Sequence, residues 1–140
     1  MTMMSETMIH DLLRDVGGLG PARVVLRTCA GFMELFCDLA ECRLAGGWLT
    51  VRRDEAHLHV PMAAVHSACL FEAGDQAHPH APSFWLVGRC GKPSVIVILD
   101  VTDGAHRVRQ ETAFRAVRAR WGERIAFHQE TGATPERVLL

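Results

Sequence analysis

The stretch that decides the fold is SFWLVGRCGKPSVIVIL, residues 83–99. Residues 84–87 and 95–101 are mostly aromatic, apolar or β-branched, a composition that favours strands. Gly88 and Gly91 lie between the two runs and predict a tight turn. We therefore expect an antiparallel hairpin. Its second strand is expected to be buried on both faces, because every residue from 95 to 99 is apolar.

The chain before this hairpin is also rich in strands. Five segments share short apolar or alternating runs and are expected to be strands: 22–29, 32–37, 48–52, 55–60 and 65–71. The first two are expected to pair with each other as a hairpin. Residues 38–45 are ambiguous, and residues 73–82, with two prolines, predict a polar loop.

One helix is expected at each end of this region. Ser5 is placed to cap a first helix of about ten residues, which ends at Gly17 and Gly18. The second helix carries Phe114 and Val117 and begins at Thr112 or earlier. The helices enclose successive strands, so the sequence predicts an α+β fold with a mostly antiparallel, split-barrel-like sheet and flanking N- and C-terminal helices.

Length and composition limit the function classes. The 140 residues fit one domain, 1–140, in which residues 122–140 are expected to form a loosely ordered tail with a short strand or turn near 125–128. A net charge of −1 gives no reason to expect nucleic acid or an anionic membrane as partner. Five cysteines without a CxxC pair argue against a disulfide framework or zinc ribbon. No signal peptide or membrane span is visible, so we expect a cytoplasmic protein.

Histidines are concentrated in the middle third of the chain: His57, His59, His66, His78 and His80. The period-two pattern of residues 55–60 places the first two on one face of a strand. They are either ligands or ordinary solvated residues. His66, within an apolar strand, is either a ligand or a half-buried structural residue. The His-Pro-His segment at 78–80 suits a borderline transition metal such as Zn²⁺ or Cu²⁺, and it equally fits a solvated loop.

Several short segments follow one another in the order found in a known protein family. Leu19-Gly20-Pro21 leads into a strand that ends at Leu26-Arg27-Thr28, Met33-Glu34 follows, and Ala56-His57-Leu58-His59 precedes the closing hairpin. From residue 12 to 121 this order resembles one repeat of the HemS/ChuX-like family of cytoplasmic haem-utilisation proteins. The chain departs from the family pattern where Met33 replaces a His and Ile96 replaces a Lys.

The resemblance implies haem as cofactor and a single-repeat protein that forms homodimers. It implies His57 as the leading axial ligand of the haem iron, with His66, His78 or His80 in reserve. Arg27 matches the family's arginine and is either a propionate partner or an ion-pair partner of Glu34. Met33 is either a thioether ligand or core filler.

Three functions follow from this resemblance. The first is a haem carrier or store in iron acquisition, and the second is a haem-degrading enzyme of the same family. The third is a dimeric scaffold that keeps the fold without haem. No residue is assigned as catalytic, because no nucleophile lies in a recognisable motif. The arginines on and beside the last helix are expected to form a solvated face.

Overall fold

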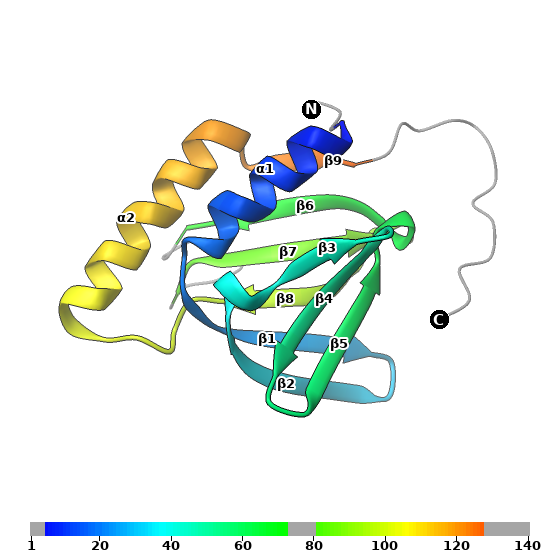
Figure 1. The fold of residues 1–140 in the computed structure, drawn as a ribbon, viewed down its shortest axis with the longest axis horizontal. Helices are drawn as coiled ribbons and strands as arrows, with labels where there is room; N and C mark the ends of the chain where they lie inside the picture. Colours follow the sequence, from blue (N-terminus) through cyan, green and yellow to red (C-terminus); the bar gives the residue numbers. More distant parts are fainter. Residues whose placement is uncertain (1–4, 73–80, 128–140) are drawn as a thin grey trace.

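The computed structural model describes residues 5–72 and 81–127. These residues form two antiparallel sheets and two α-helices (Figure 1). The larger sheet has six strands in the order β2-β1-β8-β7-β6-β9, and the smaller has three in the order β3-β4-β5. This confirms the predicted α+β class with flanking helices. The strands do not close into a barrel.

The six-stranded sheet is built from strands that lie far apart in the sequence: β1 (Pro21–Thr28), β2 (Gly31–Asp38), β6 (Val65–Phe71), β7 (Ser83–Gly88), β8 (Pro93–Ile98) and β9 (Arg124–Ala126). The three-stranded sheet is local in sequence: β3 (Arg43–Ala45), β4 (Trp48–Arg53) and β5 (Ala56–Pro61). The helices are α1 (Glu6–Gly17) and α2 (Gly104–Trp121), and the short 3-10 helices are η1 (Leu39–Glu41) and η2 (Met62–Ala64).

The predicted hairpin of residues 83–99 is present as β7 and β8. Phe84 pairs with Val97 and Leu86 with Val95. The expected strand at 95–101 is too long, because β8 ends at Ile98. Asp100 leaves the ladder and turns its carboxylate toward Arg23 on β1, and Val101 is exposed.

The core lies between the inner face of the large sheet, the small sheet and the helices. Figure 1 shows the small sheet crossing in front of the large one. Val24, Leu86 and Val97 of the large sheet share one buried cluster with Leu49 and Val60 of the small sheet. Burial of this apolar surface is the main stabilising term.

The two helices lie side by side and complete this core. Ser5 caps α1 as predicted, because its hydroxyl accepts a hydrogen bond from the Met8 N–H at 3.2 Å. Asp15 of α1 accepts bonds from Arg120 and from the Trp121 indole N–H of α2, both at 2.8 Å.

Two arginines of α2 depart from the expected solvated face. Arg107 donates to the backbone carbonyl of Thr102, and Arg118 donates to that of Leu70. Strand β9 occupies residues 124–126 of the segment expected to be a tail and pairs with β6.

Candidate functional site

Four polar side chains share the outer face of the small sheet, and we call them the histidine face: Thr50, Arg52, His57 and His59. Arg52 lies directly opposite His57 in the β4–β5 ladder, and Thr50 lies opposite His59. Both histidines are exposed, whereas Val60 of the same strand is buried. The period-two interpretation of this strand is therefore confirmed, and side chains directly opposite each other lie on the same face.

The two imidazole rings of this face are stacked. Their centroids are 5.8 Å apart and their planes differ by 16°. His59 Nδ1 lies 3.0 Å from the Thr50 hydroxyl oxygen. When Nδ1–H donates to that oxygen, the Nε2 lone pair of His59 is free for a ligand. Arg52 makes no hydrogen bond or ion pair with any residue in the described part of the chain, so its guanidinium is available to an anion.

A small apolar cavity of about 160 Å³ lies between β5 and the β1–β2 hairpin. It is lined by Val24, Leu26, Met33, Glu34, Leu35, Ala56, His57 and Leu58. His57 and Met33 both line this cavity. Met33 is 71% exposed, so its interpretation as core filler is wrong. Pockets that enclose drug-sized ligands are roughly 300–1,000 Å³, so a large planar ligand would lie on the surface beside this cavity.

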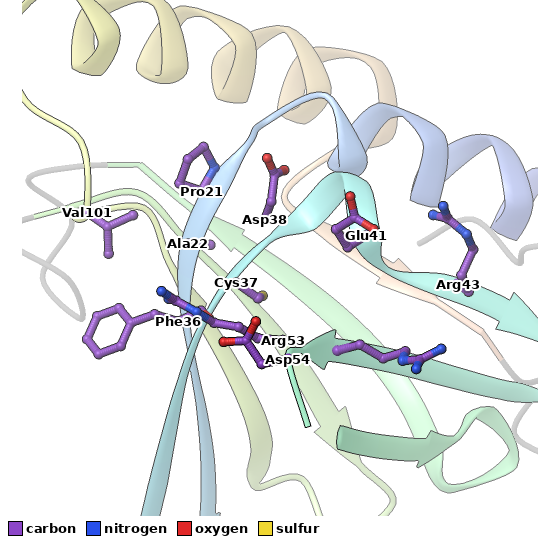
Figure 2. A pocket seen from close by; sticks show the side chains of 11 residues that line it. Pro21, Ala22, Phe36, Cys37, Asp38, Glu41, Arg43, Arg53, Asp54 and Val101 are labelled. Atoms are coloured by element: carbon purple, nitrogen blue, oxygen red, sulfur yellow. The ribbon is translucent and has the colours of Figure 1, made fainter. Parts of the chain in front are cut away.

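A larger open cleft of about 780 Å³ lies at the other end of β2 (Figure 2). Its charged lining residues are Asp38, Glu41, Arg43, Arg52, Arg53 and Asp54, three acids and three arginines. Arg53 donates to the Phe36 carbonyl at 2.9 Å, and Arg43 donates to the Ala40 carbonyl at 2.8 Å. The cleft thus carries balanced charge, and Arg52 is the residue that it shares with the histidine face.

Two cysteines interact beside this cleft. Cys37 is buried at the end of β2, Cys42 follows η1, and both are free thiols. A hydrogen bond from Cys42 lowers the pKa of the Cys37 thiol, because it favours the thiolate. The same hydrogen bond, together with burial, raises the pKa of Cys42.

Arg27 is not brought to the histidine face. It is exposed near the end of β1, opposite Phe32 of β2. Its neighbour Leu26 lines the small cavity, and side chains alternate along a strand, so Arg27 projects from the opposite face of the large sheet.

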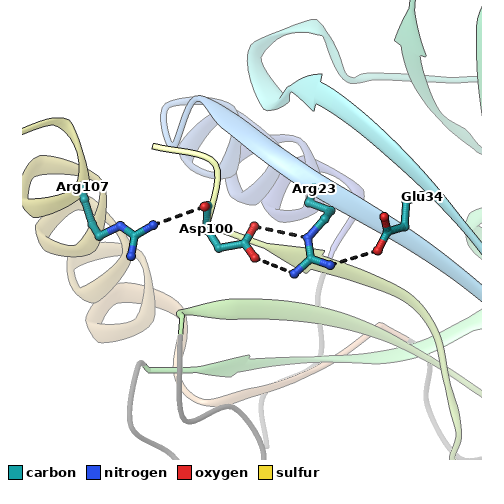
Figure 3. A network of polar contacts seen from close by, with 4 residues as sticks. All are labelled: Arg23, Glu34, Asp100 and Arg107. Atoms are coloured by element: carbon teal, nitrogen blue, oxygen red, sulfur yellow. Dashed lines mark hydrogen bonds and ion pairs between the residues drawn. The ribbon is translucent and has the colours of Figure 1, made fainter. Parts of the chain in front are cut away.

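The alternative role of Arg27, an ion pair with Glu34, is wrong. Glu34 pairs with Arg23 at 2.9 Å instead (Figure 3). Arg23 also donates to both carboxylate oxygens of Asp100, and Arg107 donates to the Asp100 backbone carbonyl at 3.2 Å. Hydrogen bonding to Asp100 is the main cause that raises the pKa of Arg23.

The structure describes one of the three reserve histidines, His66. His66 is half-buried on β6, with three strands between it and the β2 edge, and it does not line the His57 cavity. His78 and His80 lie outside the described residues.

Sequence reasoning missed Thr50, Arg52 and the positioning of His59. The signal was available in the two-residue turn Asp54-Glu55, which sets the register of its hairpin. That register pairs 53 with 56, 52 with 57 and 50 with 59.

Two further features of the described residues bear on function. None of the helices in the described segments is long and apolar enough to cross a membrane. Within residues 5–72 and 81–127, no group of three or more His, Cys, Asp or Glu side chains is arranged to hold a metal ion.

No family model matches the chain, and no curated protein matches its sequence. Solved structures share its fold. ChuX matches with a TM-score of 0.62 at 16% identity, over 80% of this chain and 71% of that one. A protein from Agrobacterium tumefaciens matches with a TM-score of 0.61 at 16% identity, over 79% of this chain and 65% of that one. This chain therefore spans less than two thirds of that protein.

Two of these structures are described by what they do with haem. ChuX is described as a haem-binding protein. ChuS, a haem-degrading enzyme of Escherichia coli O157:H7, matches with a TM-score of 0.53 at 16% identity, over 78% of this chain and 34% of that one. At this identity a structural match establishes the fold, and function is argued from the site. The chain has the HemS/ChuX-like fold that its sequence pattern indicated.

Proposed function

We propose that this protein binds haem on the histidine face and serves as a cytoplasmic carrier or store in haem iron utilisation. The observation that carries the proposal is the cross-strand pair of His57 and Arg52. It sets an exposed imidazole beside a guanidinium that has no hydrogen-bond or ion-pair partner in the part of the chain that the structure describes. Haem presents an iron that takes an imidazole and propionates that take a cation. ChuX, a haem-binding protein with the same fold, supports the assignment.

His57 is the proposed axial ligand. Its stacking on His59, which Thr50 holds, orients the ring. Trp48 is exposed on the same face and offers an aromatic surface to the porphyrin. Arg52 takes the propionate role that the sequence pattern gave to Arg27, because Arg52 lies opposite His57.

A hemin titration of the full-length protein tests this assignment. We expect His57→Ala to shift the Soret band and to weaken hemin binding at least tenfold, with unchanged far-ultraviolet dichroism. Arg52→Gln is expected to weaken binding several-fold. Arg27→Gln, a matched exposed arginine on the other sheet, is expected to have no effect.

His106→Ala is the histidine control, because His106 is exposed on α2, far along the chain from β5. If His57→Ala leaves the Soret band unchanged, His57 is not the ligand. If hemin does not bind, the dimeric scaffold becomes the better proposal. An effect of Arg27→Gln but not of Arg52→Gln would return the propionate role to Arg27.

Haem degradation is the second candidate function, and the match to ChuS favours it. A reductant and oxygen added to the haem complex separate the two functions. A carrier keeps its Soret band over many minutes beyond the free-hemin control, whereas a degrading enzyme loses the band and releases iron.

A homodimer is the proposed assembly, and β2 is the proposed contact strand. It is an edge strand of the large sheet, and it exposes Phe32, Met33 and Phe36. Exposed apolar edge strands are templates for pairing with another chain. Light scattering is expected to give twice the 15.5 kDa chain mass. Phe36→Lys is expected to give monomers and Trp48→Lys to leave the dimer intact. A monomeric wild type would contradict the proposal.

A further inference from the structure

We infer that His57 and His59, without haem, chelate one borderline divalent transition-metal cation such as Ni²⁺, Cu²⁺ or Zn²⁺. This inference goes beyond haem binding and uses a second capability of the same face. The two residues occupy alternate positions of β5, so both side chains leave the strand on the same side.

The spacing of the rings supports chelation. Alternate residues of a strand are about 6.6 Å apart along its axis. The ring centroids are only 5.8 Å apart, so the rings lean toward each other, and their planes are nearly parallel at 16°. Metal–imidazole bonds are about 2.0–2.1 Å, so two nitrogens on one ion lie about 3 Å apart. We expect rotation of the exposed His57 side chain, while Thr50 holds His59, to reach this separation without moving the backbone.

The Thr50 hydroxyl is placed to accept a hydrogen bond from His59 in the tautomer that chelation requires. Nδ1 of His59 lies 3.0 Å from the Thr50 hydroxyl oxygen. A metal-binding histidine donates its other ring N–H to an oxygen in this way, which fixes the ring and directs the free nitrogen to the ion. In that tautomer the Thr50 hydroxyl has the part that a carboxylate or carbonyl plays in other metal sites.

The donor set selects the class of cation. Imidazole suits nickel, copper and zinc, whereas magnesium and calcium require oxygen ligands. Two imidazoles leave the remaining coordination positions to water, so the site is open and its affinity is modest. Arg52, directly opposite His57, repels a cation and weakens binding further. Removal of this charge is therefore expected to strengthen the site.

Titration of nickel chloride into the tag-free, haem-free full-length chain tests the inference, with calorimetry and NMR line broadening as readouts. We expect one Ni²⁺ per chain, with broadening centred on β4 and β5. His57→Ala and His59→Ala are each expected to weaken binding at least tenfold. Arg52→Gln is expected to tighten it several-fold. His106→Ala is the control and is expected to bind like the wild type.

Two further variants keep the inference falsifiable. His78→Ala/His80→Ala removes the other closely spaced histidine pair, and Cys29→Ser/Cys90→Ser removes the two exposed thiols. Both are expected to retain nickel binding. Loss of binding in either of them, with His57→Ala unchanged, would overturn the inference. If Arg52→Gln does not tighten nickel binding, the inference is also overturned, because the ion then lies away from the β4–β5 ladder.

The two proposals fail separately. Nickel binding without a hemin response would leave the chelate standing and remove the haem function. A hemin response that depends on His57, without nickel binding, would leave the haem function standing and remove the chelate. Both His57 and His59 are exposed, so their alanine variants are expected to fold, which far-ultraviolet dichroism checks.

Discussion

Substitution of Gln110 is the sharpest test of how the helices hold the sheet. Gln110 lies on α2 and is only 5% exposed. Its side-chain amide donates to the carbonyls of Leu19 at 2.8 Å and Pro21 at 2.9 Å, and its oxygen accepts from the Thr102 hydroxyl at 3.0 Å. One buried side chain thus joins α2 to the turn that leads from α1 into β1.

Gln110→Leu keeps the volume and removes all three bonds. An unsatisfied buried polar group costs about 1–3 kcal/mol, and two carbonyls lose a donor here. Burial of the leucine side chain offsets about 1.5–3 kcal/mol of that loss, and water that reaches the part-buried Pro21 carbonyl reduces the loss further. We expect a net loss of about 2 kcal/mol in the free energy of unfolding. For a chain of this size that corresponds to a fall in Tm of about 6–8 °C.

Urea unfolding of the wild type and the variant measures this loss. Thr102→Val is the matched control, because it removes only the third bond and is expected to cost about 1 kcal/mol. Gln110→Glu supplies a second check. A buried carboxylate facing two carbonyls has a raised pKa, so the destabilisation by this variant should grow as pH rises from 5 to 8. A loss below about 0.5 kcal/mol for Gln110→Leu would refute the reasoning.

Two other substitutions test the core and the charged network. Phe114→Ala removes a fully buried ring from α2 and is expected to cost about 3–5 kcal/mol in urea unfolding, whereas the exposed Thr112→Ala on the same helix should change little. Asp100→Asn weakens the partly exposed pair with Arg23, whose side chains are 27% and 30% exposed, and is expected to cost about 1 kcal/mol, a loss that should shrink in 1 M salt. A loss that does not change with salt would show that shape rather than charge holds Asp100.

The sequence alone determined the elements and their class. The run at 83–99, the alternation at 55–60 and the Ser5 cap each depend on neighbours within a few residues, so local patterns predicted them. The alternation by itself places His57 and His59 on one face. Side-chain period is a property of the strand itself and needs no tertiary information.

The tertiary structure decided which residues meet. Glu34 lies opposite Val25, so Arg23 and Arg27 are both its diagonal neighbours on one face of the sheet. Glu34 pairs with Arg23, the arginine that Asp100 also binds from the segment after β8. The pair of Arg52 and His57 is local instead, because the two-residue turn sets its register, whereas the exposure of Met33 depends on the place of β2 at the edge of the large sheet. Pairing between strands is set by register and by the order of strands in the sheet, which depend on contacts across the whole chain.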